Sequence, residues 1–132
     1  MRETMIKNLA YYFVAGLMLL CASCEFEEDQ LGLPRIVTFP KEGGEKTFKA
    51  ECDLTYIYIK DKAGNRAFLH EADGLGVGIY KWLTVKAPLG DYLMFQDMLT
   101  IIVEPNTSGK SRKLYVHFDS GWKYGVIEVK QE

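Results

Sequence analysis

The sequence has no excess of basic charge, few histidines and cysteines, and no helical pattern after its apolar N-terminal stretch. Its 16 Lys and Arg against 18 Asp and Glu give a net charge of −2, so nothing in the charge balance favours binding to nucleic acid. Two histidines and three cysteines in 132 residues are few ligands for a transition metal. With 48% hydrophobic and 26% charged residues, the chain has the composition of one globular domain.

Catalytic and cofactor motifs are also missing. His70, Glu71 and Asp73 have metal-ligand side chains, but no second histidine follows at helical spacing. The Gly-Lys-Ser run at 109–111 lacks the earlier glycine of a phosphate-binding loop, because position 104 is Glu. There is no G-x-S-x-G sequence, and no pair of carboxylates is spaced for glycosidase chemistry. We therefore predict a protein that is not an enzyme and that holds no metal or cofactor.

The N-terminal stretch has the features of a secretion signal. Arg2 and Lys7 supply basic residues, the run 9–20 is apolar but short for a bilayer span, and no charge follows until Glu25. The residues Leu20-Cys21-Ala22-Ser23-Cys24 then resemble the end of a bacterial lipoprotein signal peptide, although Cys21 stands where Leu is usual. This resemblance implies that residues 1–23 are cleaved and that the Cys24 sulfur carries diacylglycerol. An uncleaved signal anchor is the alternative.

Residues 24–34 are predicted to form an acidic tether. Like charges in the run 25–30, Glu-Phe-Glu-Glu-Asp-Gln, would keep a solvated chain extended. Acidic runs at this place also resemble those that send some lipoproteins to the outer face of the outer membrane. We therefore expect an outer-membrane protein, lipid-anchored and exposed at the cell surface, with the leaflet left open.

Cysteine usage after such a cleavage leaves no intrachain disulfide. Cys21 would leave with the signal peptide and Cys24 would carry the lipid, so Cys52 has no partner. The simplest interpretation of Cys52 is a buried apolar side chain.

From residue 35 to 132 the sequence predicts an all-β domain, an immunoglobulin-like β-sandwich of seven or eight strands. Apolar residues recur at every second position, and Gly, Pro, Asn and Asp separate the runs. Within this domain the segment 74–78 is predicted to be flexible, and the segment 61–80 is a long insertion of undefined role. The predicted strands are 36–39, 47–52, 55–60, 67–69, 80–85, 99–103, 114–118 and 124–130.

Four segments in order resemble the BACON domain, a Bacteroidetes-associated carbohydrate-binding family that is often N-terminal. They are Gly43-Gly44 before a strand, Trp82-Leu83-Thr84-Val85 with Pro88 and Gly90 after it, the run 103–109 followed by Arg112, and the closing run 126–131. The resemblance covers residues 36–131 and implies the sandwich fold and a carbohydrate-binding role. Trp82 and Gly109 have fold roles of their own, as a core side chain and a turn residue.

Four exposed aromatic residues are the candidates for glycan contact. Trp122 is predicted in a tight hairpin loop with Tyr124 two residues on, and Tyr56 and Tyr58 fall outward if Ile57 and Ile59 are core. Ordinary cross-strand packing is the alternative for each of them.

The function expected from these features is binding of glycans or host glycoproteins, mucin among them, in an outer-membrane nutrient system. Its expected partners are the membrane, through the anchor, and a polysaccharide or glycoprotein. The alternative is a structural or protein-interaction module, which would dock a membrane complex through an outer-membrane protein or act as a spacer.

Overall fold

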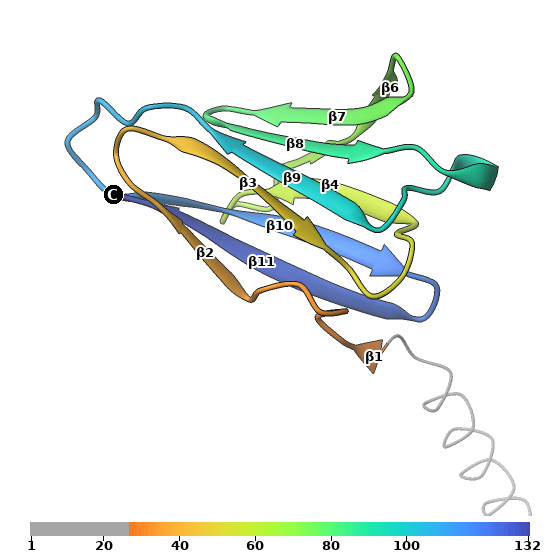
Figure 1. Ribbon diagram of the computed structural model, residues 1–132. Helices are drawn as coiled ribbons and strands as arrows, with labels where there is room; N and C mark the ends of the chain where they lie inside the picture. The colour runs from red at the N-terminus through yellow and green to blue at the C-terminus, as the bar shows by residue number, and fades with distance from the viewer. Residues whose placement is uncertain (1–26) are drawn as a thin grey trace, which may run out of the picture.

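The computed structural model describes residues 27–132, which form two β-sheets packed face to face (Figure 1). Cys24 and the predicted signal peptide lie outside the described residues. The first sheet consists of β1 (Glu27–Glu28), β2 (Ile36–Phe39), β4 (Tyr56–Lys60), β5 (Arg66–Phe68), β10 (Arg112–Ser120) and β11 (Lys123–Gln131). The second consists of β3 (Gly44–Lys49), β6 (His70–Ala72), β7 (Leu75–Tyr80), β8 (Leu83–Pro88) and β9 (Met98–Val103). The predicted all-β, immunoglobulin-like sandwich is confirmed.

The hairpin of β10 and β11 forms the centre of the first sheet. The two strands pair antiparallel from Arg112 opposite Gln131 to Ser120 opposite Lys123. β4 pairs with the free edge of β10 and β5 with β4, while β1 and β2 both pair in parallel with β11, β1 at its start and β2 at its end. The sheet therefore presents a broad outer face across four antiparallel strands.

The core lies between the sheets and follows the predicted alternation. Ile57, Ile59, Leu99, Val116 and Phe118 are all essentially inaccessible to solvent. Their outward neighbours are partly exposed, as the side-chain period of two in a β-strand requires. The alternation of inward and outward side chains that the sequence predicts is thus confirmed in β4, β9 and β10.

Cys52 is exposed, so the prediction of a buried side chain is wrong. The alternation that places Ala50 inside stops there, because β3 ends at Lys49 and the chain turns away from the sheet. The Cys52 sulfur instead lies 3.2 Å from the Ser120 hydroxyl, beside the β10–β11 turn.

Of the glycine-rich segment 74–78, Gly74 lies in a turn and residues 75–78 belong to β7, so the segment is not a flexible loop. It pairs with β8 across a turn at Lys81 and Trp82, which divides the predicted strand 80–85 between two strands. Gly76 and Gly78 face the interior, where a Cβ atom on Gly78 would lie 2.7 Å from Leu69 Cδ1 and one on Gly76 would overlap the Phe95 ring. These glycines make room for neighbouring side chains, which a local pattern does not reveal.

Residues 27–34 pack against the sandwich, which corrects the expected solvated tether over this range. Leu31 and Leu33 belong to the core, and the Gln30 amide donates to the carbonyl of Val126 and accepts from its N–H. The acidic run suggested a solvated chain, and Leu31 and Leu33 follow directly after it in the sequence, so their burial was not predicted. The folded domain therefore begins much closer to Cys24 than the sequence predicts.

The end of the sandwich opposite the β10–β11 turn is closed by three residues of the segments that resemble the BACON domain, namely Asn106, Arg112 and Gln131. The Asn106 side chain accepts from the N–H of Ser108 and donates to the carbonyls of Lys110 and Glu132. Arg112 lies 4.7 Å from the ring centre of Trp82, which is buried as predicted. These are structural roles, and they bring no ligand site with them.

The long segment between β4 and β8 is fixed to the first sheet through Asp61. Its carboxylate accepts hydrogen bonds from the Tyr80 hydroxyl at 2.5 Å and from the Asn65 side chain and backbone at 2.9 Å. The Tyr80 bond is the largest cause of a lowered Asp61 pKa. Because Tyr80 ends β7, this bond joins the two sheets.

Replacing Tyr80 with Phe should destabilise the domain at neutral pH and much less in acid. A carboxyl with a depressed folded pKa contributes stability that is present above its ordinary pKa of 3.8 and lost as pH falls through the folded pKa. Without the Tyr80 hydroxyl the pKa of Asp61 in the folded protein rises toward 3.8. The free energy of unfolding of the variant therefore falls less on acidification than that of the wild type. Urea unfolding of both proteins from about pH 7 to about pH 2 measures this. A stability difference that does not change with pH would contradict the role of Asp61.

Candidate functional site

The outer face of the first sheet carries a group of aromatic side chains. Tyr56 and Tyr58 point outward from β4 because Ile57 and Ile59 fill the core. Phe68 on β5, His117 on β10 and Tyr124 on β11 lie on the same side of the sheet. We call these five side chains the aromatic face.

Tyr58 is at the centre of the aromatic face. In the strand register it stands between Phe68 and His117, and its ring centre lies 5.1 Å from that of Phe68 and 4.8 Å from that of His117. The imidazole stacks on Tyr58 at an interplanar angle of 10°. The Arg66 guanidinium lies 5.0 Å from the Tyr58 ring centre. Cross-strand contacts of this kind hold a flat, rigid surface.

A second row crosses the sheet next to the first. Asp119 on β10 is opposite Tyr56 on β4 and Tyr124 on β11. Tyr56 is 61% exposed and Tyr124 is 36% exposed, so both rings are accessible. Partial burial raises the pKa of Asp119 above its ordinary value. A carboxyl between two tyrosines gives the aromatic face a hydrogen-bonding group at its middle.

The polar border of the aromatic face includes His117. Burial, followed by the nearby charges of Lys60 and Arg66, lowers the pKa of His117 below 6.5. The imidazole is therefore neutral at pH 7 and has one nitrogen to donate and one to accept hydrogen bonds. A shallow hollow beside it is lined by Lys60, Asp61, Lys62, Tyr115 and His117.

Three of the four predicted contact residues lie on this face of the sheet, and the fourth lies in the turn at its end. Tyr56, Tyr58 and Tyr124 belong to the aromatic face, whereas Trp122 is in the turn between β10 and β11. Sequence reasoning missed Phe68 and His117 as members of the aromatic face and Asp119 as its polar neighbour. Alternation indicates which side of a strand a residue faces, but the strand register decides its neighbours.

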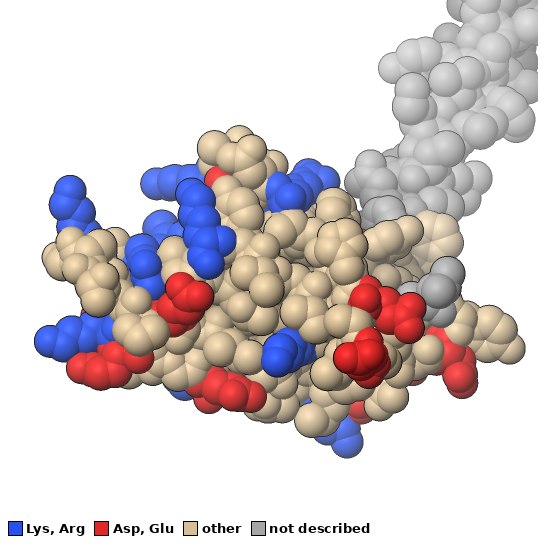
Figure 2. All heavy atoms as spheres, turned by 90° about the horizontal axis from the view of Figure 1, so that it is seen from above, with Lys and Arg blue, Asp and Glu red and all other residues tan. Residues whose placement is uncertain are grey.

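Charged side chains are spread unevenly over the molecule. In the view of Figure 2, most Lys and Arg side chains lie on the left half, and acidic side chains lie on both halves. Close to the C-terminus, a hollow is lined by Ser111, Arg112, Lys113, Lys130 and Gln131.

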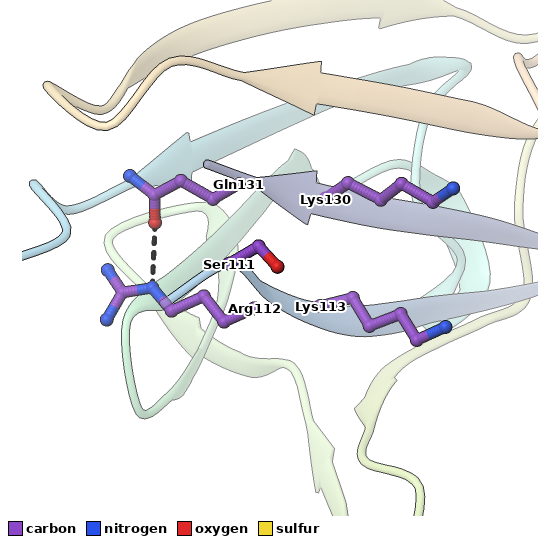
Figure 3. Close-up of a pocket in the computed structure, with 5 residues that line it drawn as sticks. All are labelled: Ser111, Arg112, Lys113, Lys130 and Gln131. Carbon is purple, nitrogen blue, oxygen red and sulfur yellow. Dashed lines mark hydrogen bonds between the residues drawn. The ribbon is translucent and has the colours of Figure 1, made fainter. Parts of the chain in front are cut away.

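That second hollow is not an anion site. Arg112 donates to the Gln131 side chain at 2.8 Å and to the carbonyls of Glu104 and Pro105, so its guanidinium is engaged in closing the sandwich (Figure 3). Lys113 and Lys130 point away from this pair (Figure 3) and both lie within 4 Å of the Glu128 carboxylate, at 3.4 Å and 3.8 Å. Among residues 27–132, no three metal-ligating side chains gather as metal ligands would.

The fold and this surface define an all-β sandwich domain with an exposed aromatic face. No protein-family model matches the chain, and no curated protein matches it. Among solved structures it is similar to an NMR structure of a protein from Bacteroides thetaiotaomicron, with 18% sequence identity and a TM-score of 0.49. That similarity covers 82% of this chain and 85% of the other. Within the part of the chain that the structure describes, there is no helix of the length and hydropathy needed to cross a bilayer.

Proposed function

We propose that this protein is a non-catalytic surface lipoprotein of the BACON type that binds glycans through the aromatic face. The observation that supports this most strongly is the grouping of Tyr56, Tyr58, Phe68 and Tyr124 on neighbouring strands of one sheet. Hydrophobic side chains on a sandwich are normally inside, so an exposed group of rings on a flat sheet needs a reason.

The chemistry of the aromatic face suits a sugar. A pyranose ring has one face of C–H groups that stacks on an aromatic ring, and hydroxyl groups around its edge that need hydrogen-bond partners. Tyr56 and Tyr124 offer exposed rings, with Asp119 between them as a hydrogen-bonding group. His117 and Arg66 pack on the half-buried Tyr58 ring and add donors and acceptors beside it. The surface is an exposed sheet face and not an enclosed cavity, which favours an extended or branched chain over a small molecule.

The proposed location follows from the N-terminal sequence. A thioether-linked lipid on Cys24 would hold the domain at the outer membrane, facing outward, where polysaccharides and host mucin-type glycoproteins are found. In this setting the protein would retain glycans for an uptake system and leave hydrolysis to other proteins.

Binding should be lost when the rings of the aromatic face are removed. We expect Tyr56→Ala and Tyr58→Ala to weaken binding to mucin glycans or to a responsive polysaccharide by about 10-fold or more each, since aromatic side chains dominate such contacts. The measurement is calorimetry or retardation in a gel containing the polysaccharide.

Ile79→Ala is the matched control. Ile79 is 66% exposed on β7 of the second sheet, so it is comparable in exposure and lies outside the aromatic face. It should bind as the wild type does. If no glycan binds, or if the control weakens binding equally, the proposal is wrong. Co-purification with outer-membrane proteins without any response to sugars would favour the alternative, a protein-interaction module.

A further inference from the structure

The described chain begins at the β10–β11 turn, and its backbone is bound there. The Glu27 N–H donates to the Trp122 carbonyl at 2.7 Å, and the Asp29 N–H donates to the Tyr124 carbonyl at 2.8 Å. The Lys123 ammonium lies 3.3 Å from the Asp29 carboxylate. The start of β1 is therefore fixed next to Trp122 and is not a free tether.

The distance from Cys24 to this turn is limited by the chain. Glu27 is three residues after Cys24, and three fully extended residues span at most about 11 Å. Since the Glu27 nitrogen is 2.7 Å from the Trp122 carbonyl oxygen, the backbone at Trp122 lies close to Cys24 whatever path the chain takes. The headgroup region is about 5–8 Å thick on each side of a bilayer. A lipid on Cys24 would therefore hold Trp122 within reach of this region.

The side chains at this end suit a lipid surface. Trp122 is 69% exposed at the tip of the hairpin. The turn η1 (Asp91–Leu93), which carries the 95% exposed Tyr92, lies at the same end of the sandwich (Figure 1). Trp and Tyr are the residues that concentrate at the membrane–water interface, because each has an apolar ring and a polar group. Charges of both signs meet beside the turn, where the Lys123 ammonium is paired with the Asp29 carboxylate, so the contact does not depend on attraction to anionic lipid.

We infer that Trp122 inserts into the headgroup region of the bilayer that holds the Cys24 lipid, and thereby fixes the orientation of the domain. The occupant of this surface is phospholipid, and the inference rests on the proposed lipidation of Cys24. The acyl chains supply the affinity, while Trp122 supplies a second point of contact that stops the sandwich from turning about its anchor. The long axis of β10 and β11 then rises from the membrane, and the aromatic face is presented beside it.

The chain offers an internal control. It has two tryptophans, and Trp82 is buried beside Arg112, at the far end of β10 from Trp122. β10 runs from Arg112 to Ser120, so the two indoles are roughly 25–30 Å apart along the strand direction. Fluorescence of the wild type compared with that of Trp122→Phe therefore reports Trp122, and Trp122→Phe alone reports Trp82.

The test uses the full lipidated protein, extracted from membranes and reconstituted in phosphatidylcholine vesicles with or without brominated acyl chains. Bromine quenches only indoles at the bilayer. We expect brominated lipid to reduce the Trp122 contribution, taken as the difference in emission between the wild type and Trp122→Phe, about twofold or more. Vesicles should also protect Trp122 from acrylamide, a quencher dissolved in water. Glycan binding by Trp122→Phe should equal that of the wild type.

The possible outcomes distinguish membrane insertion of Trp122 from the lipid anchor and from glycan binding. Vesicle flotation with no quenching of Trp122 beyond that of Trp82 would overturn the insertion and leave the lipid anchor standing. A protein that does not float with vesicles would overturn both the anchor and the insertion. If Trp122→Phe loses glycan affinity while quenching is absent, Trp122 belongs to the glycan site and the insertion is wrong.

Discussion

Replacing Phe118 with Ala should lower the free energy of unfolding by about 3–5 kcal/mol, the largest effect expected of any single core substitution here. Phe118 is fully buried on β10, the strand that pairs with both β4 and β11. Its ring occupies the space over Gly125, where a Cβ atom would lie 2.8 Å from Phe118 Cε2. The mutation would leave a cavity in the middle of the sandwich that the paired strands cannot close. Urea unfolding of residues 25–132 measures the change.

Phe68→Ala is the control for this substitution. Phe68 is the same residue type, but it is 45% exposed on the edge strand β5, so its loss should cost about 1 kcal/mol or less. Equal losses from Phe68 and Phe118 would show that the ring of Phe118 is not in a packed core.

Gly125→Ala should also destabilise the domain, here through overpacking. The added methyl group would overlap the Phe118 ring and lie 2.9 Å from the Asp29 carbonyl oxygen.

The fold was predictable because its strands are local patterns. In β10 the buried residues Leu114, Val116 and Phe118 alternate with Tyr115 and His117, and this alternation alone assigns the strand and its inner face. The turn at Gly109, with a φ of 77°, is also a local requirement. An all-β sandwich follows from several such strands in about a hundred residues.

The errors arise where distant contacts decide the structure. Gly76 and Gly78 were predicted to be flexible. They lie in a strand, and Phe95 and Leu69 occupy the space that their side chains would need. Residues 27–34 were predicted to be a tether, yet the Leu31 side chain is buried and its carbonyl accepts a hydrogen bond from the distant Glu51 N–H at 2.8 Å. Neither contact leaves a periodic signal in the sequence.

The candidate site was half predictable for the same reason. The outward direction of Tyr56 and Tyr58 follows from alternation, and so does the inward direction of Ile57 and Ile59. The stack of Tyr58 on His117 does not, because these residues are far apart in sequence and meet only through the β4–β10 register. The position of Trp122 next to β1 likewise depends on a parallel pairing that nothing local indicates.

Replacing Cys24 with Ala should abolish incorporation of labelled palmitate, and Cys21→Ala should not. Each buried methylene of an acyl chain contributes about 0.8 kcal/mol, so a sulfur that carries diacylglycerol keeps the protein in the membrane. Cys21 is three residues before Cys24 and would leave with the predicted signal peptide, so it serves as the matched control. Label should fall to background in Cys24→Ala alone. The distinction from an uncleaved signal anchor is clear, because such an anchor would hold the protein in the membrane without any label.

The most direct test of the anchor is the mass of the N-terminal peptide of the protein extracted from membranes. The predicted result is a peptide that begins at Cys24 and carries the mass of a diacylglyceryl group and an additional acyl chain. A peptide that begins at Met1, or a Cys24 with a free thiol, would contradict the lipid anchor, and the membrane contact of Trp122 would be lost with it.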